Sequence, residues 1–489
     1  MHRVKTASAD ATRPFCLLGA TVLLAVALLW HPATGWNVNS RLSLTMAIVD
    51  HGEVTIDRYH DVAPTQTDDK AYFEGHYYSD KTIGLSLLAV PAYAGIKFVS
   101  VVTGRTFGFA TVNWLLTVWA VGVPAALAAM FMALLFVRLG ALPSRAVLMT
   151  AFVVFGSLMF GYSTVFMPYL PGVAACAGAL VMTLGHAFDR RRAAAVGALL
   201  GVSVLFDLMF VIVAVAIAVV AARAMWPSGR RAAMRLGAVA MLAVAVPIGV
   251  FAAYCIAIFG SPTIPYRYEA SQFFRDGMAQ GLMGATAPKP GAAYHLLVHP
   301  FRGVLFWSPW LAMVAVCWVW IARHAGQLRW LVVMSATVFA LYLAYDAGYY
   351  LWWGGDAMGP RLLLPMFAVV PLALAVAGRA DAPRWMWWGV VATGVTSVAL
   401  SLPVSMINPQ TPVRDATTDL LHPTFSSGFE ATQLHLLGHF YRLEWGAAEV
   451  AAGGSSALRL FACLVVVVVG VALAWRAART ARCCYLATP

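Results

Sequence analysis

Charged residues are scarce in this chain of 489 residues. They make up 11% of the sequence and hydrophobic residues make up 61%, whereas a soluble domain is about half apolar and about a quarter charged. Many of the apolar residues form runs of about 20, the length that crosses the hydrocarbon core of a bilayer. The composition therefore excludes a soluble enzyme and a disordered chain, and it predicts a polytopic membrane protein.

Cysteine and the common phosphate or metal motifs are also lacking or rare. The seven cysteines lie in apolar runs or in the C-terminal tail: Cys16, Cys176, Cys255, Cys317, Cys463, Cys483 and Cys484. This placement excludes a disulfide framework and a cysteine-based metal site. The sequence also lacks a glycine-rich phosphate loop, an HExxH motif and a clear internal repeat.

The apolar runs predict an all-α fold of about 12 transmembrane helices, within a range of about 11 to 13. We expect the spans near 14–31, 110–137, 146–164, 170–187, 193–209, 210–223, 236–259, 303–322, 330–350, 361–378, 385–405 and 457–475. Together they make residues 1–489 a single membrane domain. Basic residues precede the first run as in a signal peptide, but no small-residue cleavage site follows, so we expect a retained anchor.

The distribution of lysine and arginine predicts the orientation. With a cytoplasmic N-terminus, nineteen of the 33 basic residues fall in the N-terminal segment, the short inner loops and the C-terminal tail. They are Arg3, Lys5, Arg13, Arg138, Arg145, Arg190, Arg191, Arg192, Arg223, Arg230, Arg231, Arg235, Arg323, Arg329, Arg379, Arg384, Arg476, Arg479 and Arg482. Both termini are therefore expected in the cytoplasm, and the net charge of +12 is explained without nucleic acid.

The longest polar segments are expected on the opposite, outer side. The run 82–102 is apolar, but a crossing there would invert every later loop, so we expect a helix that dips into the outer leaflet and returns. The first outer loop then spans 32–109, with juxtamembrane helices, and further outer loops span 260–302 and 406–456. Because the inner loops are short, we expect the chemistry at the outer face.

The first outer loop opens with "WNVNSRLSLTMAIVDHG", which has the apolar spacing of a helix. Asn37 is expected to cap its start and Gly52 to end it. The pattern predicts an amphipathic helix whose apolar side lies on lipid. Arg41 on its polar edge has two interpretations: it extends to lipid headgroups, or it binds a phosphate bidentately.

The stretch "YFEGHYYSDKTIG", residues 72–84, concentrates polar groups. It predicts a short hairpin with Glu74 and Gly75 at its tip, followed by Asp80 and Lys81 at the start of the 82–102 helix. Asp80 alone suffices for a helix N-cap. A lysine beside the positive end of a helix requires an anionic partner, which is either Asp80 or a bound phosphate.

An acid–lysine pair after a tyrosine, within a long first outer loop, resembles the GT-C glycosyltransferases. The closest resemblance is to the protein O-mannosyltransferase and lipid A aminoarabinose-transferase group, whose first loop carries an acid, an arginine and then Tyr-x-Glu-Lys-Pro-Pro. The segment "YSDK", Tyr78 to Lys81, matches that motif with Asp for Glu, and "TI" replaces the prolines. Arg41 stands where the group has its arginine, but Val38 and Asn39 stand where it has its acid.

Two later stretches look like a bacterial branch of the same superfamily. They are "HPFRGVLFWSPWL", residues 299–311, and "WWGGDAMGPRLLLP", residues 352–365. Each places a lone arginine, Arg302 or Arg361, near glycines at the outer membrane edge. Interfacial anchoring beside tryptophans is one interpretation. Phosphate binding is the other; it is favoured for Arg361 and equally supported for Arg302.

The resemblance implies transfer of a sugar from a polyprenyl-phosphate donor to a lipid, glycan or protein acceptor, with inversion. A carboxylate must take the acceptor proton, and fixed cations must hold the developing phosphate charge. The candidate bases are Asp80, Asp57 and Asp356. The candidate ligands of donor phosphate and sugar are Arg41, Lys81, Arg361, Arg302, Tyr78, Tyr77 and His76. No cofactor is required, although Asp57 with Asp61 offers oxygen ligands for a divalent metal.

These expectations place the protein in a bacterial inner (plasma) membrane, with its active site outside and membrane lipids as its surroundings. Two other classes stay open. A secondary transporter also has about 12 spans, although it usually shows broken helices or repeated halves. A polyprenyl-linked polysaccharide polymerase or ligase uses similar donors, but its main arginine-bearing loop comes late in the chain.

Overall fold

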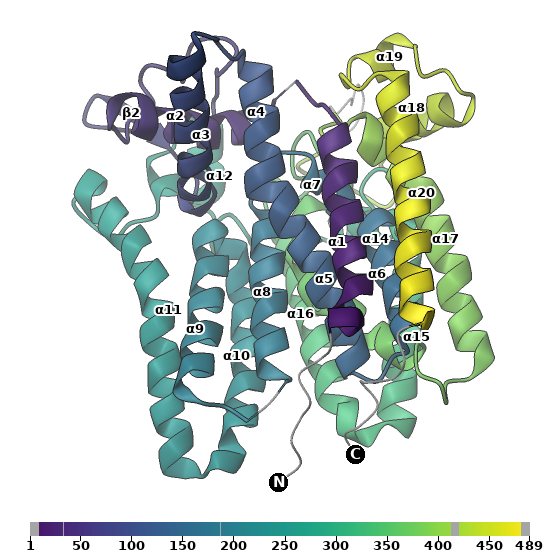
Figure 1. Cartoon of the computed structure of the whole chain (residues 1–489). Coiled ribbons are helices and arrows are strands. Elements are labelled where there is room, and N and C mark those ends of the chain that lie inside the picture. Colours follow the sequence, from purple (N-terminus) through teal and green to yellow (C-terminus); the bar gives the residue numbers. More distant parts are fainter. Residues whose placement is uncertain (1–8, 33, 186, 412–419, 481–489) are drawn as a thin grey trace.

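The computed structural model describes residues 9–32, 34–185, 187–411 and 420–480. Arg3, Lys5, Arg482 and the two C-terminal cysteines of the sequence analysis lie outside these ranges. The described chain forms a helical bundle with a layer of shorter elements at one end (Figure 1). Helix α1 begins and helix α20 ends at the opposite end of the bundle.

Every expected span falls on a helical segment of the bundle. The segments are α1 (Ala9–Leu28), α4 (Phe109–Thr117), η1 (Val118–Gly122), α5 (Val123–Arg138), α6 (Pro143–Phe155), α7 (Leu158–Ser163), α8 (Tyr169–Thr183), α9 (Arg190–Phe206), η2 (Leu208–Phe210), α10 (Val211–Met225), η3 (Trp226–Ser228), α11 (Arg230–Phe259), α14 (Val304–Trp307), α15 (Trp310–His324), η5 (Gly326–Leu328), α16 (Arg329–Gly348), η6 (Arg361–Ala368), η7 (Val370–Val376), α17 (Arg384–Ile407) and α20 (Ala457–Thr480). In the described residues, 7 continuous helical segments are long and apolar enough to cross a membrane, and shorter apolar helices accompany them.

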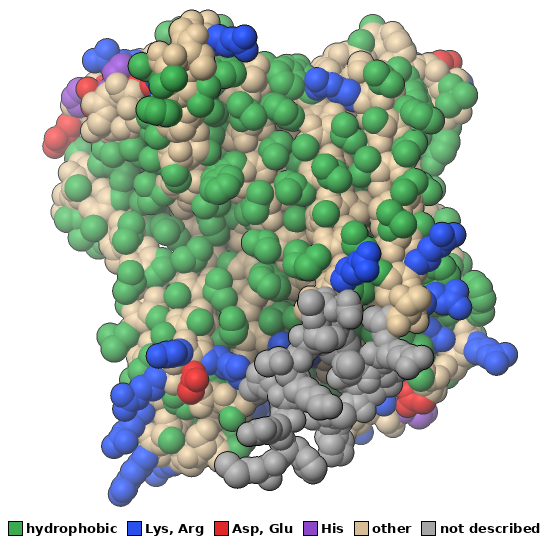
Figure 2. All heavy atoms as spheres, in the orientation of Figure 1, with side chains coloured by type: hydrophobic (Ala, Val, Ile, Leu, Met, Phe, Trp, Pro, Cys, Tyr) green, Lys and Arg blue, Asp and Glu red, His purple; other side chains and the backbone are tan. Residues whose placement is uncertain are grey.

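The outside of the bundle is apolar, as lipid contact requires. Along α11, for example, Met241, Leu242 and Val246 are exposed. Figure 2 shows hydrophobic side chains over the middle of this face and lysine and arginine side chains gathered at its lower end. Arg190 and Arg230 begin helices at that end. The separation of apolar and basic surface agrees with the polytopic membrane protein predicted from the sequence.

The expected span 361–378 is helical but not α-helical. It forms the two 3₁₀ segments η6 and η7, almost all of whose side chains are buried. Pro365 and Pro371 lie in these segments, and each removes a backbone donor that an α-helix would use. The segment therefore lies inside the bundle rather than at its lipid surface.

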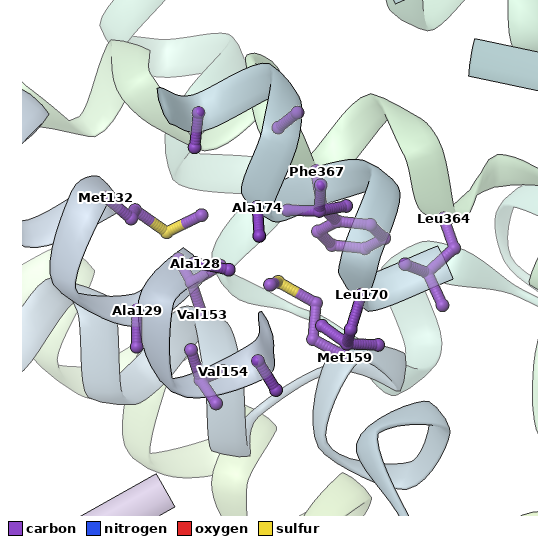
Figure 3. Close-up of a cluster of buried hydrophobic side chains, with 14 of the residues drawn as sticks. Ala128, Ala129, Met132, Val153, Val154, Met159, Leu170, Ala174, Leu364 and Phe367 are labelled. Carbon is purple, nitrogen blue, oxygen red and sulfur yellow. The ribbon is translucent and has the colours of Figure 1, made fainter. Parts of the chain in front are cut away.

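The core beside η6 is made of closely packed apolar side chains. Figure 3 shows Met132 of α5, Met159 of α7 and Phe367 of η6 directed toward a common centre, with small residues of α5 and α8 beside them. All three large side chains are buried. Close packing of this kind fills the space between the helices.

The layer at the upper end of Figure 1 is named the cap layer. Its elements are α2 (Trp36–His51), β1 (Lys70–Phe73), β2 (His76–Ser79), α3 (Gly84–Thr103), η4 (Pro265–Tyr268), α12 (Gln272–Met278), α13 (Pro290–Leu297), α18 (Thr432–Tyr441) and α19 (Ala448–Ala451). They come from the three loops expected on the outer side. The strands pair antiparallel from Lys70↔Ser79 to Phe73↔His76, which confirms the predicted hairpin.

Helix α2 differs in two ways from its prediction. Gly35, not Asn37, precedes it, while Gly52 ends it in the left-handed conformation as expected. Val38 and Leu42, expected on lipid, are buried in the main core. The amphipathic pattern is real, but its apolar side packs against protein because the cap layer lies on the bundle.

Helix α3 is the run that we expected not to cross. Its length and composition would allow a crossing, but it lies in the cap layer beside the first half of α4 and above α9 (Figure 1). The Thr82 hydroxyl, just before α3, donates to the Phe206 carbonyl at the end of α9 at 2.6 Å. Helix α3 thus starts where α9 ends, and its juxtamembrane position stays a prediction.

Candidate functional site

The base of the hairpin brings an acid and a lysine together. The register Lys70↔Ser79 places the residues flanking the two strands side by side. Lys81 Nζ lies 3.0 Å from Asp69 Oδ2 and also pairs with Asp80. Burial alone lowers the pKa of Lys81, but the carboxylates of Asp69 and Asp80 outweigh it and raise the pKa well above its usual value. Lys81 is therefore a permanent cation.

Arg41 reaches the same region from α2. Its side chain is almost fully buried, with Nη1 donating to Asn37 and Nη2 lying 3.8 Å from Asp207 Oδ2. Asp207 follows α9, and its Oδ1 accepts from the Met209 backbone N–H at 3.0 Å. Because the guanidinium points into the protein, Arg41 does not extend to lipid headgroups.

Arg361 is the first residue of η6 and directly follows the loop 349–360. Gly354 has a φ of 74°, and a Cβ there would lie 3.1 Å from Arg361 Cγ. Only glycine both adopts this backbone and leaves room for the arginine. Arg361 Nε is buried without a hydrogen-bond partner, and no ion pair joins Arg361 to a carboxylate within the described residues.

Arg302 supports the loop 349–360 through hydrogen bonds to its backbone. It donates to the carbonyl oxygens of Trp353 at 2.7 Å, Gly355 at 2.9 Å and Phe301 at 3.1 Å. Its side chain is buried and does not line the cavity described next. The structure thus makes Arg302 a support of the turn that carries Asp356 and Arg361.

The cations meet at a cavity of about 670 Å³ between the cap layer and the bundle. Its cationic residues are Arg41, Lys81 and Arg361, and its acidic residues are Asp69, Asp207, Glu269 and Asp356. Its aromatic residues are Trp36, Tyr169, Tyr266, Phe273, Phe274, Tyr345, Tyr349 and Tyr350, and its methionines are Met167, Met209, Met278 and Met283. A charged centre within an apolar, aromatic wall suits a ligand with an anionic group and an apolar part.

Glu269 differs from the other acids. It is buried and lies next to Lys81 and to Asp80. Burial and then the neighbouring Asp80 charge raise the pKa of Glu269 far above its usual value, which favours its protonated form. The segment that carries it is fixed to the hairpin, since the Ala270 backbone N–H donates to the Lys70 carbonyl at 2.9 Å.

The structure brings four of the predicted site residues to the cavity: Arg41, Lys81, Arg361 and Asp356. Asp80 lies behind Lys81, is buried, and accepts from the Ser40 hydroxyl at 3.2 Å. Its contact with the cavity is therefore made through Lys81.

The remaining predicted residues lie on β2 or in the loop before the hairpin and do not line the cavity; they are His76, Tyr77, Tyr78 and Asp57. Asp57 accepts from the Tyr77 backbone N–H and pairs with His76 Nδ1, both at 2.7 Å. Tyr78 packs against Phe259 in a separate small core. Across the residues described, no group of three or more His, Cys, Asp or Glu side chains has the geometry to hold a metal.

The residues predicted from the sequence do not include Asp69, Asp207, Glu269 or the tyrosines of the cavity. "TDDK" offered a weak signal, because two acids before a strand at the membrane surface are unusual. Glu269 and Tyr266 gave none, because they lie within a long polar loop that meets the hairpin through tertiary contacts such as the isolated bridge Ala71↔Glu269.

No protein-family model and no curated protein sequence matches this chain. The chain does resemble two crystal structures of ArnT from Cupriavidus metallidurans. The structure bound to undecaprenyl phosphate matches with a TM-score of 0.51 at 15% identity, over 97% of this chain and 78% of that chain. The apo structure gives 0.48 at 15% identity, over 94% and 75%. At this identity the likeness concerns the fold alone: the chain has a polytopic, ArnT-like membrane fold, as expected from its sequence.

Proposed function

We propose that this protein is a membrane glycosyltransferase that moves a sugar from a polyprenyl-phosphate donor to an acceptor hydroxyl. One observation carries the proposal: Arg41, Lys81 and Arg361, from three separate segments, line one cavity beside the membrane-spanning bundle. Converging cations of this kind bind phosphate. The acceptor class, a lipid, a glycan or a protein, stays open.

Arg361 supports the phosphate assignment most directly. A buried N–H without a partner costs free energy, and Arg361 Nε is such a group in the described part of the chain. A phosphate oxygen would accept from it with a charge-assisted hydrogen bond. Arg302 then contributes by holding the turn from Trp353 to Gly355 in place.

The apolar wall supports a lipid-linked donor. Methionine side chains adapt to irregular apolar surfaces, and four of them line the cavity together with Leu208, Leu351 and Leu362. The ArnT structure with the same fold was crystallised with undecaprenyl phosphate. A polyprenyl chain between the helices would keep the phosphate at the cavity and the tail in the membrane.

The reaction that suits this arrangement is a single displacement with inversion at the anomeric carbon. A carboxylate removes the acceptor proton while the acceptor oxygen attacks. The cations stabilise the negative charge that develops on the departing phosphate. Because the proton acceptor and the cations are side chains, the proposed step needs no further cofactor.

The competing classes receive less support. A transporter needs an internal path, but apolar side chains of α5, α6, α7, α8 and η6 fill the centre drawn in Figure 3. A polymerase or ligase with a late arginine-bearing loop is less consistent with a cavity to which the first loop supplies Arg41, Asp69 and Lys81.

The binding test compares Arg361→Ala with Arg267→Ala in purified protein. Arg267 is exposed on η4 and does not line the cavity. We expect Arg361→Ala to weaken binding of undecaprenyl phosphate at least about tenfold, since a hydrogen bond to a charged group contributes roughly 1.5–3 kcal/mol. Arg267→Ala should bind like the wild type. Equal binding by Arg361→Ala would contradict the phosphate assignment.

We propose that the cavity lies on the outer side of a bacterial inner membrane, because the positive-inside distribution of lysine and arginine supports that orientation. Labelling of single cysteines in a cysteine-free background tests this. A cysteine replacing the exposed Asp61 should react with an impermeant thiol reagent in intact cells, and one replacing the exposed Ser228 should not. A reporter active only outside the cytoplasm, fused at Gly104, should be active. The reverse results would overturn the orientation.

A further inference from the structure

The family resemblance predicts an acid near position 39, but this chain has Asn39 there. Asn39 forms hydrogen bonds with backbone carbonyl groups. It is buried, and its amide Nδ2 donates to the carbonyl oxygens of Pro64 at 3.2 Å and Gln66 at 2.8 Å. A carboxylate cannot donate in this way. Asn39 therefore binds the segment that leads into the hairpin.

Thr67 completes the attachment of that segment. Its hydroxyl donates to the Trp36 carbonyl at 2.8 Å, at the start of α2. The same oxygen accepts from the Asp69 backbone N–H at 3.1 Å. The route from α2 to Asp69 thus consists of successive hydrogen bonds through Asn39 and Thr67, and it fixes the backbone of Asp69 beside the cavity.

Asp69 and its neighbour Asp68 face opposite ways. The Asp69 carboxylate is 15% exposed, lines the cavity and lies 3.0 Å from Lys81 Nζ. The Asp68 carboxylate is 53% exposed, does not line the cavity and lies 3.6 Å from Lys70 Nζ. The chain thus supplies two adjacent, chemically identical side chains, of which one reaches the site.

We infer that Asp69 is the general base of the proposed transfer, an assignment that rests on the proposed function. The acceptor oxygen forms a bond to the anomeric carbon while the bond from that carbon to the phosphate oxygen breaks. The hydroxyl proton goes to Asp69, and the bonding electron pair stays with the departing polyprenyl phosphate. One negative charge therefore disappears at Asp69 and one appears on the phosphate, and Lys81 can pair with either.

The other carboxyl groups have competing duties. Asp80 does not line the cavity and is held by Lys81 and Ser40. Asp207 caps η2 and pairs with Arg41. Glu269 has an oxygen without a partner in the described structure but lies against Asp80, where two charges repel. Asp356 lines the cavity from the loop 349–360 and is the alternative general base. The experiment must therefore distinguish Asp69 from Asp356.

The experiment uses the full chain in lipid nanodiscs with a panel of undecaprenyl-phosphate hexoses and pentoses and with extracted envelope lipids and glycans as acceptors. Release of undecaprenyl phosphate measures turnover. We expect Asp69→Asn to lower kcat by at least about 100-fold, the usual range for a lost general base, with undecaprenyl phosphate binding within about threefold of the wild type. Asp69→Glu should recover part of the loss, and Asp68→Asn should turn over normally.

The wild type separates two kinds of failure. A wild type that releases no undecaprenyl phosphate from any donor overturns the proposed function and this assignment with it. An active wild type with an active Asp69→Asn overturns the assignment alone, and so does a loss confined to Asp356→Asn. If Asp69→Asn loses turnover only because it no longer binds undecaprenyl phosphate or has a lowered melting temperature, Asp69 is structural and the assignment also falls.

Discussion

The two ends of the β1–β2 hairpin have opposite roles although their sequences are equally polar. At the tip, Glu74 and Gly75 take positive φ angles, and nearby His76 is exposed and paired with Asp57. At the base, Asp69 and Lys81 are largely buried and line the cavity. Four residues of strand separate them by about 13 Å. The polar stretch therefore serves one site only at its base, and its tip stabilises the loop.

Among substitutions at Lys81, Asp57, Glu269 and Glu74, Lys81→Ala should have the largest effect on folding and transfer together. It removes a cavity cation and leaves Asp69 and Asp80 without their partner. We expect transfer to fall at least about tenfold, and stability to fall as well, since an unpaired buried charge costs about 3–5 kcal/mol. Turnover per folded molecule and melting temperature should be measured together. The matched control is Lys70→Ala. Lys70 begins the other strand of the hairpin, and its partner Asp68 is exposed. If Lys81→Ala kept full transfer, Asp80 and Lys81 would form only a helix cap with a salt bridge.

Asp57→Asn should act on the tip alone. The variant weakens the bonds to His76 and to the Tyr77 backbone, and Asp57 is partly exposed, so we expect a loss of at most about 1 kcal/mol of stability. Transfer should stay within about twofold of the wild type. A loss of transfer larger than tenfold in folded protein would show that the tip reaches the substrate.

Glu269→Gln tests the buried surroundings of Lys81 at the base of the hairpin. Because the pKa of Glu269 is raised in the folded protein, the folded state holds a proton that the unfolded state releases above its ordinary pKa, so the wild type loses stability as pH rises. Glutamine resembles the protonated acid but does not titrate, so Glu269→Gln should not lose stability in this way as pH rises. We expect transfer within about threefold, and a melting temperature that falls less between pH 5 and pH 8 than in the wild type. If the melting temperatures of both proteins fell equally between pH 5 and pH 8, Glu269 would be ionised in the folded wild type.

Glu74→Ala should have the smallest effect. Glu74 adopts a φ of 49° at the turn, a conformation that glutamate and alanine both disfavour because each carries a Cβ. We expect less than about 0.5 kcal/mol of change in stability and unchanged transfer. Measurable loss of turnover would mean that the tip contacts the acceptor.

The fold was largely predictable, since apolar length and the positions of arginines are local signals. The hairpin was predictable too, because "EG" between two polar-aromatic runs is a turn signal. The membership of the cavity was only partly predictable. Arg41, Lys81 and Arg361 were predicted as cations at the membrane edge. Asp69 becomes a neighbour of Lys81 through the hairpin register, whereas Glu269 does so only when a distant loop docks on the hairpin. Burial of that kind depends on tertiary contacts such as Ala71↔Glu269, which leave no periodic pattern in the sequence.

The near balance of charge in the cavity has a consequence for turnover. Arg41 and Lys81 already have carboxylate partners there, and only Arg361 lacks one among the residues described. On the proposed function, the donor is a phosphodiester with one negative charge and the spent carrier lipid is a monoester that approaches two at neutral pH. A cavity with strongly unbalanced positive charge would retain the carrier and slow each cycle by product inhibition. The carboxylates beside Lys81 and Arg41 compete with the spent phosphate and favour its exchange for a fresh donor.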